Sequence, residues 1–328
     1  MAKKYKKKNK GCFNCNINCS RYYITPEVES EGPEYETLCS FSSRIGNQDL
    51  EFALKMNQYL NTMGVDSLSM GETIGWAMEC VEKGIFTRDD FDGLDFTWGN
   101  LETIQTIVER VVNMEGIGQE FARGTRHLAQ TMGKGSEKYA LHVKGLDVIC
   151  GDPRGIKAFG LTYAIASRGG DHLRAEPFFE LTNRFEEAEK RFGTRDAANR
   201  LSDNGKAKLV EFTERQALLT DCLTMCKNVG LSMDVLDFDL ASDLLRAGTG
   251  LAFTGDRVDT ALKNCITNDR LMNIDFGVTA KDDTLPHRFT HEPLTEGDSK
   301  DQVVPVRDMV KDYYKIKGWD EHGVPKKS

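Results

Sequence analysis

Three cysteines lie close together near the start of the chain. Cys12, Cys15 and Cys19 fall in the segment GCFNCNINCS, and Gly11 gives the backbone a permissive hinge before them. Three neighbouring thiolates with one remote thiolate are a common way to hold an iron–sulfur cluster. Zinc also accepts four thiolates, but zinc sites more often use two separated cysteine pairs. The spacing therefore favours an iron–sulfur cluster over zinc, with Cys226 as the remote candidate.

The sequence does not decide which of the remaining cysteines is the fourth ligand of the cluster. The chain has nine cysteines, an odd count, and a cluster of them in a reducing compartment indicates metal binding before disulfides. Cys80 lies among apolar residues at helical spacing, which is typical of a buried core thiol. The alternatives to Cys226 are Cys39, Cys80, Cys150, Cys222 and Cys265.

Composition narrows the class of protein. With 39% hydrophobic and 29% charged residues over 328 positions, the chain is typical of a globular protein with one large or two ordinary domains. No apolar stretch approaches the length of a membrane span, and the first ten residues, MAKKYKKKNK, lack the apolar core of a signal peptide. We therefore expect a cytoplasmic protein with no membrane partner.

The basic segment at 1–10 is predicted to be a solvated, disordered arm. It lacks the interleaved aromatic or glycine-rich sequence that accompanies many nucleic-acid-binding segments. The other basic residues are scattered, and the net charge is −8. We expect no nucleic-acid partner.

Helical periodicity dominates the elements that must position these residues. Strand-like alternation is short and rare, so the predicted fold class is mainly α, with functional residues in the loops between helices. Asn100 is a good N-cap for the helix that follows it. The predicted helices cover 48–62, 71–84, 100–114, 117–132, 176–192, 205–220, 236–247 and 255–271.

A domain boundary is predicted near 133–155, where glycine, proline and a short apolar run interrupt the helical pattern. It separates a helical domain over 11–145 from a second helical domain over 146–328. The helical period is lost after residue 272, and the last dozen residues are expected to be a frayed tail.

A series of segments in fixed order carries a family resemblance. After the cysteine segment come GPEYETL, GVDSLSMGETIGWAMECVEKG, KGLDVICGDPRG, SRGGDHLR, TDCLTMC and KDDTLPHRF, over roughly 11–295. Their order and spacing resemble the aldehyde:ferredoxin oxidoreductase family. The resemblance implies two packed helical domains like domains 2 and 3 of that family. It also implies a [4Fe-4S] cluster and a tungsten or molybdenum bis-pterin, the first domain binding cluster and pterin and the second binding pterin and substrate.

Two paired motifs follow from the resemblance. In the family, a D-x-x-G-[LV]-C motif ends in the fourth cluster ligand, and it maps here onto Asp221 to Cys226. A D-x-x-G-x-D motif maps onto 61–66, ending at Asp66. Asn61 replaces the first aspartate, keeping hydrogen bonds but no charge. Thr224 replaces the glycine of the other motif and adds a Cβ where glycine allows closer approach.

A pterin needs carboxylates against its ring N–H groups and positive charge near its phosphates. The resemblance assigns such roles to Asp66, Lys144, Asp152, Arg154 and Asp221. Taken alone, the DPRG segment predicts something simpler, a turn whose aspartate and arginine pair on the surface.

The resemblance also implies the catalytic groups. Glu36 in GPEYETL matches the family's active-site glutamate, which would serve as general base. His172 in SRGGDHLR matches the histidine that hydrogen-bonds the substrate carbonyl oxygen. Cys39 follows Glu36 and is expected to be a small packed thiol, the alternative being a group that faces the metal. His127, His287 and His291 are expected to be surface or capping residues.

The implied reaction converts an aldehyde and water to a carboxylate, with electrons leaving through the cluster to ferredoxin or a partner subunit. The family's N-terminal β domain has no counterpart, so we expect a separate polypeptide to supply it or the chain to be a truncated fragment; a homodimer stays open. One alternative is a tungsten reductase subunit of the benzoyl-CoA reductase type. Another is a non-catalytic iron–sulfur electron-transfer subunit, which would need neither Glu36, His172 nor the DPRG segment.

Overall fold

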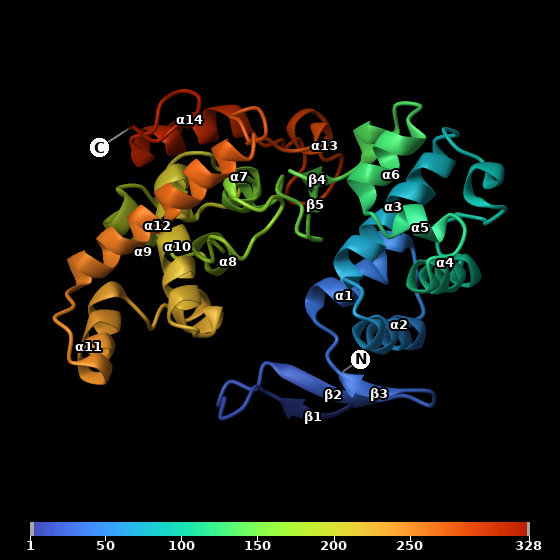
Figure 1. Cartoon of the computed structure of the whole chain (residues 1–328), viewed down its shortest axis with the longest axis horizontal. Coiled ribbons are helices and arrows are strands. Elements are labelled where there is room, and N and C mark those ends of the chain that lie inside the picture. Colours follow the sequence, from blue (N-terminus) through green and yellow to red (C-terminus); the bar gives the residue numbers. More distant parts are fainter. Residues whose placement is uncertain (1–2, 327–328) are drawn as a thin grey trace. The chain divides into compact units, whose positions relative to one another are not determined.

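A computed structural model describes residues 3–326. The chain divides into two compact units, unit 1 (Met1–Cys150) and unit 2 (Gly151–Ser328) (Figure 1). The division therefore falls after Cys150 instead of after residue 145, inside the segment where glycine and proline interrupt the helical pattern. The mainly α class is confirmed.

Unit 1 begins with a small antiparallel sheet in the order β1-β2-β3. Tyr23 of this sheet is fully buried, and its hydroxyl donates to the Leu54 carbonyl at 2.8 Å. Tyr5 joins the same apolar cluster. The prediction of a disordered arm was wrong for the first strand, because pairing and the buried tyrosines order it although its lysines are exposed. The strands are β1 (Lys6–Lys10), β2 (Ser20–Ile24) and β3 (Glu29–Glu31).

The helices of unit 1 pack around α3, whose middle is buried on all sides. Its Trp76 starts a chain of ring contacts through Phe86 and Phe91. The helices are α1 (Tyr35–Ser40), α2 (Leu50–Met63), α3 (Ser67–Glu82), α4 (Leu101–Asn113), α5 (Gly118–Phe121) and α6 (Thr125–Met132), with the hairpin β4 (His142–Val143) and β5 (Leu146–Asp147) after them.

Side-chain caps set where the long helices of unit 1 begin. Asp49 accepts hydrogen bonds from two backbone N–H groups of α2, and Asp66 accepts one from α3. Asn100 accepts the Thr103 N–H at the start of α4, as predicted. Such caps satisfy N–H groups that have no partner within the helix.

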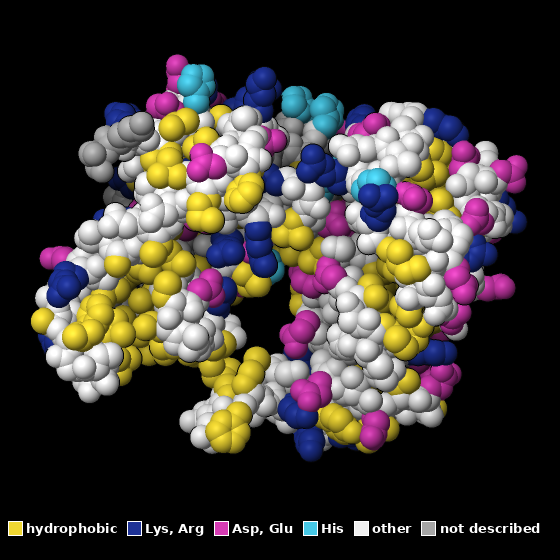
Figure 2. Space-filling model, viewed as in Figure 1, with side chains coloured by type: hydrophobic (Ala, Val, Ile, Leu, Met, Phe, Trp, Pro, Cys, Tyr) yellow, Lys and Arg dark blue, Asp and Glu magenta, His cyan; other side chains and the backbone are white. Residues whose placement is uncertain are grey.

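Unit 2 packs around α10, which contacts α7, α12 and α14. An apolar surface is left exposed on α11, where Leu240 and Leu244 are accessible, and Figure 2 shows hydrophobic side chains gathered over this region. The helices are α7 (Lys157–Ile165), α8 (Phe179–Thr182), α9 (Phe185–Phe192), α10 (Lys206–Cys222), α11 (Phe238–Thr249), α12 (Gly255–Asp275), α13 (His287–His291) and α14 (Val306–Lys317).

Two helix predictions in unit 2 differ from the structure. The single helix expected over 176–192 is divided, because Asn183 adopts φ 53° between α8 and α9. The expected loop after residue 272 contains α13 and α14, so that prediction was wrong. Lysines and aspartates between the apolar residues of α14 obscured its helical pattern in the sequence. The buried residues that recur at helical spacing are Val306, Met309, Val310, Tyr313 and Tyr314.

Over residues 3–326, none of the helices combines the length and the apolar character that crossing a bilayer requires.

Candidate functional site

The loop between β1 and β2 carries the three clustered cysteines. Pairing of Lys10 with Ser20 holds the ends of this loop together, and the N–H of Cys15 donates to the Cys12 carbonyl at 3.1 Å. A Cβ on Gly11 would lie 2.8 Å from the Asn18 side-chain oxygen. The same Cβ would lie 3.1 Å from the Asn18 Cα, so the loop packs closely at Gly11.

The loop does not by itself form a metal-binding geometry. Cys12 and Cys19 are exposed and Cys15 is half-buried. In the part of the chain that the structure describes, no three His, Cys, Asp or Glu side chains are placed to hold a metal ion. Cys226 is an exposed residue of unit 2, and the four-cysteine ligand set stays a prediction.

The two paired motifs adopt matching conformations. One follows the end of α2, where Gly64 has φ 72°, and the other follows the end of α10, where Thr224 has φ 53°. Thr224 therefore occupies the left-handed region, to which glycine is well suited and a branched side chain is not. The fourth residue of each motif thus has the same left-handed backbone conformation.

The polar side chains of these motifs are accessible. Asp66 uses one carboxylate oxygen to cap α3 at the Ser69 N–H, at 2.9 Å, and is otherwise exposed. Asp221 pairs with Lys227 at 2.7 Å. Asn61 is exposed in the last turn of α2. Asp66 also lines a cavity of about 330 Å³ in unit 1, together with the first turns of α3.

Lys144 and the DPRG segment are placed differently from each other. Lys144 is the turn residue of the β4–β5 hairpin, with φ 53°. Arg154 is buried and directs two of its nitrogens at Asp152, at 3.0 and 2.6 Å. A third nitrogen donates to the Glu292 carbonyl at 2.7 Å. The aspartate and arginine thus pair with each other, as the simpler interpretation expected; Asp152 is partly exposed, whereas Arg154 is buried.

Glu36 lies on α1 and is held by the segment that ends unit 1. The Cys150 N–H donates to the Glu36 carboxylate at 2.8 Å. Arg44 supports the same segment by donating to the Val148 carbonyl at 2.9 Å, and it pairs with buried Glu72 at 3.2 Å. The carboxylate is therefore fixed between α1 and the chain just before the unit boundary.

Two thiols accompany Glu36. Cys39, one helical turn further along α1, is hydrogen-bonded to the Cys150 thiol and lies 3.2 Å from the Ser43 hydroxyl. The bond from Cys150 lowers the pKa of Cys39 to about 6, while the same bond and then burial raise the pKa of Cys150. The positive charge of Arg44 also lowers the pKa of Cys39, against a smaller opposing effect of Glu36. Cys39 is thus a half-buried thiol with a lowered pKa, which makes it more reactive than the small packed thiol expected from sequence.

Asp147 is a buried carboxyl group that sequence reasoning missed. Burial, and next the charge of Glu72, raise the pKa of Asp147 to about 7. Hydrogen bonds to Thr125 and Ser69 partly oppose this rise in pKa. Its Oδ1 finds no hydrogen-bond partner among the described residues. Its position three residues after Lys144 in KGLDVIC was the available signal.

His172 lies in unit 2 beside a second missed carboxyl group. Its Nε2 is 3.8 Å from the Glu176 carboxylate, one helical turn away in sequence. Burial raises the pKa of Glu176 to about 7; Lys227 lowers it and Asp171 raises it. The i, i+4 spacing was the sequence signal for this pairing. At this distance the Glu176 carboxylate acts on the imidazole through charge and not through a hydrogen bond.

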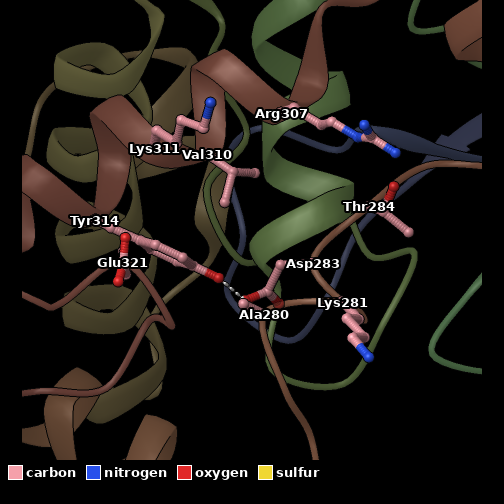
Figure 3. A pocket seen from close by; sticks show the side chains of 9 residues that line it. All are labelled: Ala280, Lys281, Asp283, Thr284, Arg307, Val310, Lys311, Tyr314 and Glu321. Carbon is pink, nitrogen blue, oxygen red and sulfur yellow. Dashed lines mark hydrogen bonds between the residues drawn. The ribbon is translucent and has the colours of Figure 1, made fainter.

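A further cavity, of about 380 Å³, is lined by the KDDTLP segment and α14 (Figure 3). Tyr314 donates to Asp283, and Arg270 pairs with the same carboxylate at 2.9 Å. The charged ends of Lys281, Arg307 and Lys311 point in different directions in Figure 3. None of the predicted site residues lines this cavity, and the buried aspartate stabilises the fold of unit 2.

Comparison with known proteins places the chain in one family. The family model described as "Aldehyde ferredoxin oxidoreductase, domains 2 & 3" matches residues 1–328. The tungsten-containing aldehyde ferredoxin oxidoreductase of Pyrococcus furiosus is 33% identical over 99% of this chain and 52% of its own length. The enzyme of the same name from Thermococcus kodakarensis is 31% identical, over 98% and 52% respectively.

Two weaker matches carry other names. The WOR-like subunit of an aliphatic sulfonate oxidoreductase of Pyrococcus furiosus is 26% identical over 96% of this chain and 48% of its own length. A solved structure titled as the active site complex BamBC of benzoyl coenzyme A reductase with 1,5 dienoyl-CoA has a TM-score of 0.79 at 22% identity. The match covers 99% of this chain and 52% of that one. At that identity the likeness shows the fold alone.

The chain spans about half the length of the curated relatives that it matches, and its family model is that of domains 2 and 3. Its fold, the two matching helix-end motifs and the order of its segments agree with that placement. The chain belongs to the aldehyde ferredoxin oxidoreductase family.

Proposed function

We propose that this chain forms the catalytic and electron-relay part of an enzyme that oxidises an aldehyde to a carboxylate at a tungsten or molybdenum bis-pterin. The observation that carries the proposal is the Glu36 carboxylate, held by a backbone N–H at 2.8 Å within a member of this family. A purely electron-transferring subunit would have no need of a carboxylate positioned in this way.

The donor set present in the chain fits a bis-pterin. Asp66 caps the start of α3 and Asp221 lies in the last turn of α10, and both carboxylates are accessible. They would accept hydrogen bonds from ring N–H groups, with Asn61 offering further bonds and Lys144 positive charge. Arg154 is committed to Asp152 and the Glu292 carbonyl, so Asp152 and Arg154 would act as one rigid unit. When bound, the cofactor supplies the centre that accepts two electrons.

We propose Cys12, Cys15, Cys19 and Cys226 as the ligands of a [4Fe-4S] cluster. Thiolates are the ligands such clusters use, and three of these stand on one short loop. The cluster would pass electrons singly to ferredoxin or to an electron-transfer subunit. A polypeptide corresponding to the other half of the relatives would complete the protein.

Glu36 and His172 would share the proton chemistry. One Glu36 oxygen is occupied by the Cys150 N–H, which leaves the other to accept a proton from the attacking water. The imidazole of His172 would donate a hydrogen bond to the aldehyde oxygen and stabilise the charge that develops there. Glu176 is the positioning residue that orients this imidazole.

The first experiment is to express the chain anaerobically in a host that makes tungsten and molybdenum pterin, and to measure metals per chain. About four irons with tungsten or molybdenum would support the proposal. Iron alone would favour an electron-transfer subunit or a need for a segment like the other half of the relatives, and zinc without iron would contradict the cluster.

The catalytic assignment is tested in the metal-loaded protein. We expect Glu36→Gln to lower kcat for simple aldehydes by about 100-fold or more while metal content stays unchanged. The matched control is Glu34→Gln, since Glu34 is exposed two residues earlier and makes no side-chain cap. Equal activity of the two variants would contradict the role of Glu36. Reduction of benzoyl-CoA without aldehyde oxidation would favour the reductase alternative.

A further inference from the structure

Cys39 and Cys150 bring two thiols from distant parts of unit 1 into contact. Cys39 stands on α1, and Cys150 follows β5 at the end of the unit. Both are half-buried free thiols whose side chains interact. The Cys150 Sγ lies 3.9 Å from the hydroxyl oxygen of Ser40, the residue after Cys39, and the Cys150 N–H donates to Glu36 at 2.8 Å. The remaining groups around Cys39 are Ser43, Arg44, Glu36 and Tyr35, so that one cation faces the pair.

We propose that Cys39 and Cys150 form a peroxide-sensitive thiol pair, in which Cys39 is the attacking thiol and Cys150 the resolving thiol that closes a disulfide. The inference stands on the contact between the two thiols and does not depend on the proposed aldehyde oxidation. The neighbouring cation and the hydrogen bonds from Ser43 and Cys150 favour a thiolate at Cys39, which is the reactive form of cysteine.

The oxidant is hydrogen peroxide. The Cys39 thiolate attacks one peroxide oxygen, the O–O bond breaks, and the departing hydroxide takes a proton to become water, leaving a sulfenic acid. Cys150 then loses its proton, its sulfur attacks the Cys39 sulfur, and the S–O bond breaks to release a second water. Two thiols and one peroxide become one disulfide and two waters, and two electrons pass from sulfur to oxygen.

The disulfide would act on the position of Glu36. It would join residue 39, one turn beyond Glu36 on α1, to residue 150, whose N–H holds the Glu36 carboxylate. Both segments that position Glu36 would then be linked covalently. Any effect on turnover rests on the proposed function, whereas formation of the bond does not.

Disulfide formation can be detected directly, because trypsin releases Cys39 and Cys150 on two separate peptides. Cleavage after Arg21 and Arg44 gives 22–44, and cleavage after Lys144 and Arg154 gives 145–154, each with a single cysteine. The folded full chain is treated with a few equivalents of hydrogen peroxide, alkylated, digested and examined by mass spectrometry. We expect the 22–44/145–154 cross-link to exceed any other by about tenfold and to disappear on reduction with dithiothreitol.

Cysteine variants and alkylation rates test whether the cross-link is specific to Cys39 and Cys150. Cys39→Ser and Cys150→Ser should abolish the cross-link, while Cys265→Ser, which removes an exposed thiol of α12, should leave it unchanged. At pH 7, iodoacetamide should alkylate Cys39 about tenfold faster than Cys265 in the same chain. Circular dichroism checks that each variant folds. Absence of the cross-link in the folded chain, or an equal yield in guanidinium-unfolded chain, would overturn the proposal.

Discussion

At the residue scale, Thr224 is a branched residue in a left-handed backbone conformation that glycine adopts more easily. The residue has φ 53°, and the next residue's N–H reaches back to the Thr220 carbonyl at 2.8 Å. A branched side chain in this region crowds its own backbone, and glycine does not.

We therefore expect Thr224→Gly to raise the free energy of unfolding by about 1 kcal/mol, measured by urea denaturation. The control is Thr267→Gly, because Thr267 lies inside α12 and there glycine should cost about 0.5–1 kcal/mol. Destabilisation of the same size at both positions would contradict the account of Thr224.

Asp147 predicts a pH dependence at the same scale. Its pKa is raised to about 7 in the folded chain from an ordinary 3.8, so the folded state binds more protons between these values. The free energy of unfolding should therefore fall as pH rises from about 4 to 7. We expect Asp147→Asn to flatten this decline, measured by denaturant unfolding at pH 5 and pH 8. An exposed carboxylate, Asp312, supplies the control variant Asp312→Asn, which should leave the slope unchanged.

At the scale of elements, close packing of α1 on α3 decides where Glu36 stands. A Cβ on Gly71 of α3 would lie 2.6 Å from the Ser40 Cβ and 2.8 Å from the Ser40 carbonyl oxygen. Any larger residue must push α1 away from α3, and α1 carries both Glu36 and Cys39.

Gly71→Ala should accordingly lower the free energy of unfolding by about 1–3 kcal/mol and slow alkylation of Cys39. Gly248→Ala is the matched control, because it is also a helix glycine but has nothing within 4 Å of an added Cβ. There alanine should stabilise the chain by about 0.5–1 kcal/mol. The free energy of unfolding of both variants is measured by thermal and urea denaturation. No change in this free energy for Gly71→Ala would show that α1 is not packed against α3 as described.

At the scale of the whole molecule, each unit has its own core, and unit 2 is held by a buried ion pair between segments far apart in sequence. The Glu180 carboxylate and the Lys206 ammonium have no exposed side-chain area. Lys206 also donates to the Ala197 and Asn199 carbonyls, and Glu180 accepts the Ala158 N–H. The pair therefore joins the starts of α7 and α10 to α8 and to the turn before α10.

Lys206→Met should cost about 3–5 kcal/mol at pH 8, because it leaves the Glu180 carboxylate buried without a cation. Burial already raises the pKa of Glu180 to about 7, so at pH 5 the group is neutral and the cost should be smaller. Lys208→Met, at an exposed position two residues later, is the control and should cost less than about 1 kcal/mol. A cost independent of pH would contradict the buried ion pair.

Much of the architecture followed from periodicity and caps. The helix predictions at 48–62, 100–114 and 255–271 are confirmed by α2, α4 and α12, because apolar spacing and capping residues are local properties of the chain. The sequence analysis did not predict helix α14, although its apolar residues recur at helical spacing. Strand β1 was not predicted either, because a run of lysines is not typical of a strand. Its hydrogen-bonded pairing with β2 orders it in the folded chain.

By itself the sequence determined the mainly α class, the three-cysteine loop and the order of the motifs that place the chain in its family. Only the tertiary structure decided which side chains meet. It brought Cys150 to Glu36 and Cys39 across more than a hundred residues, buried Arg154 against the partly exposed Asp152, and enclosed Asp147 beside Glu72. The physical reason is that helix formation depends on neighbours within a few positions, whereas burial, hydrogen bonding and pKa depend on contacts made only when distant segments pack together.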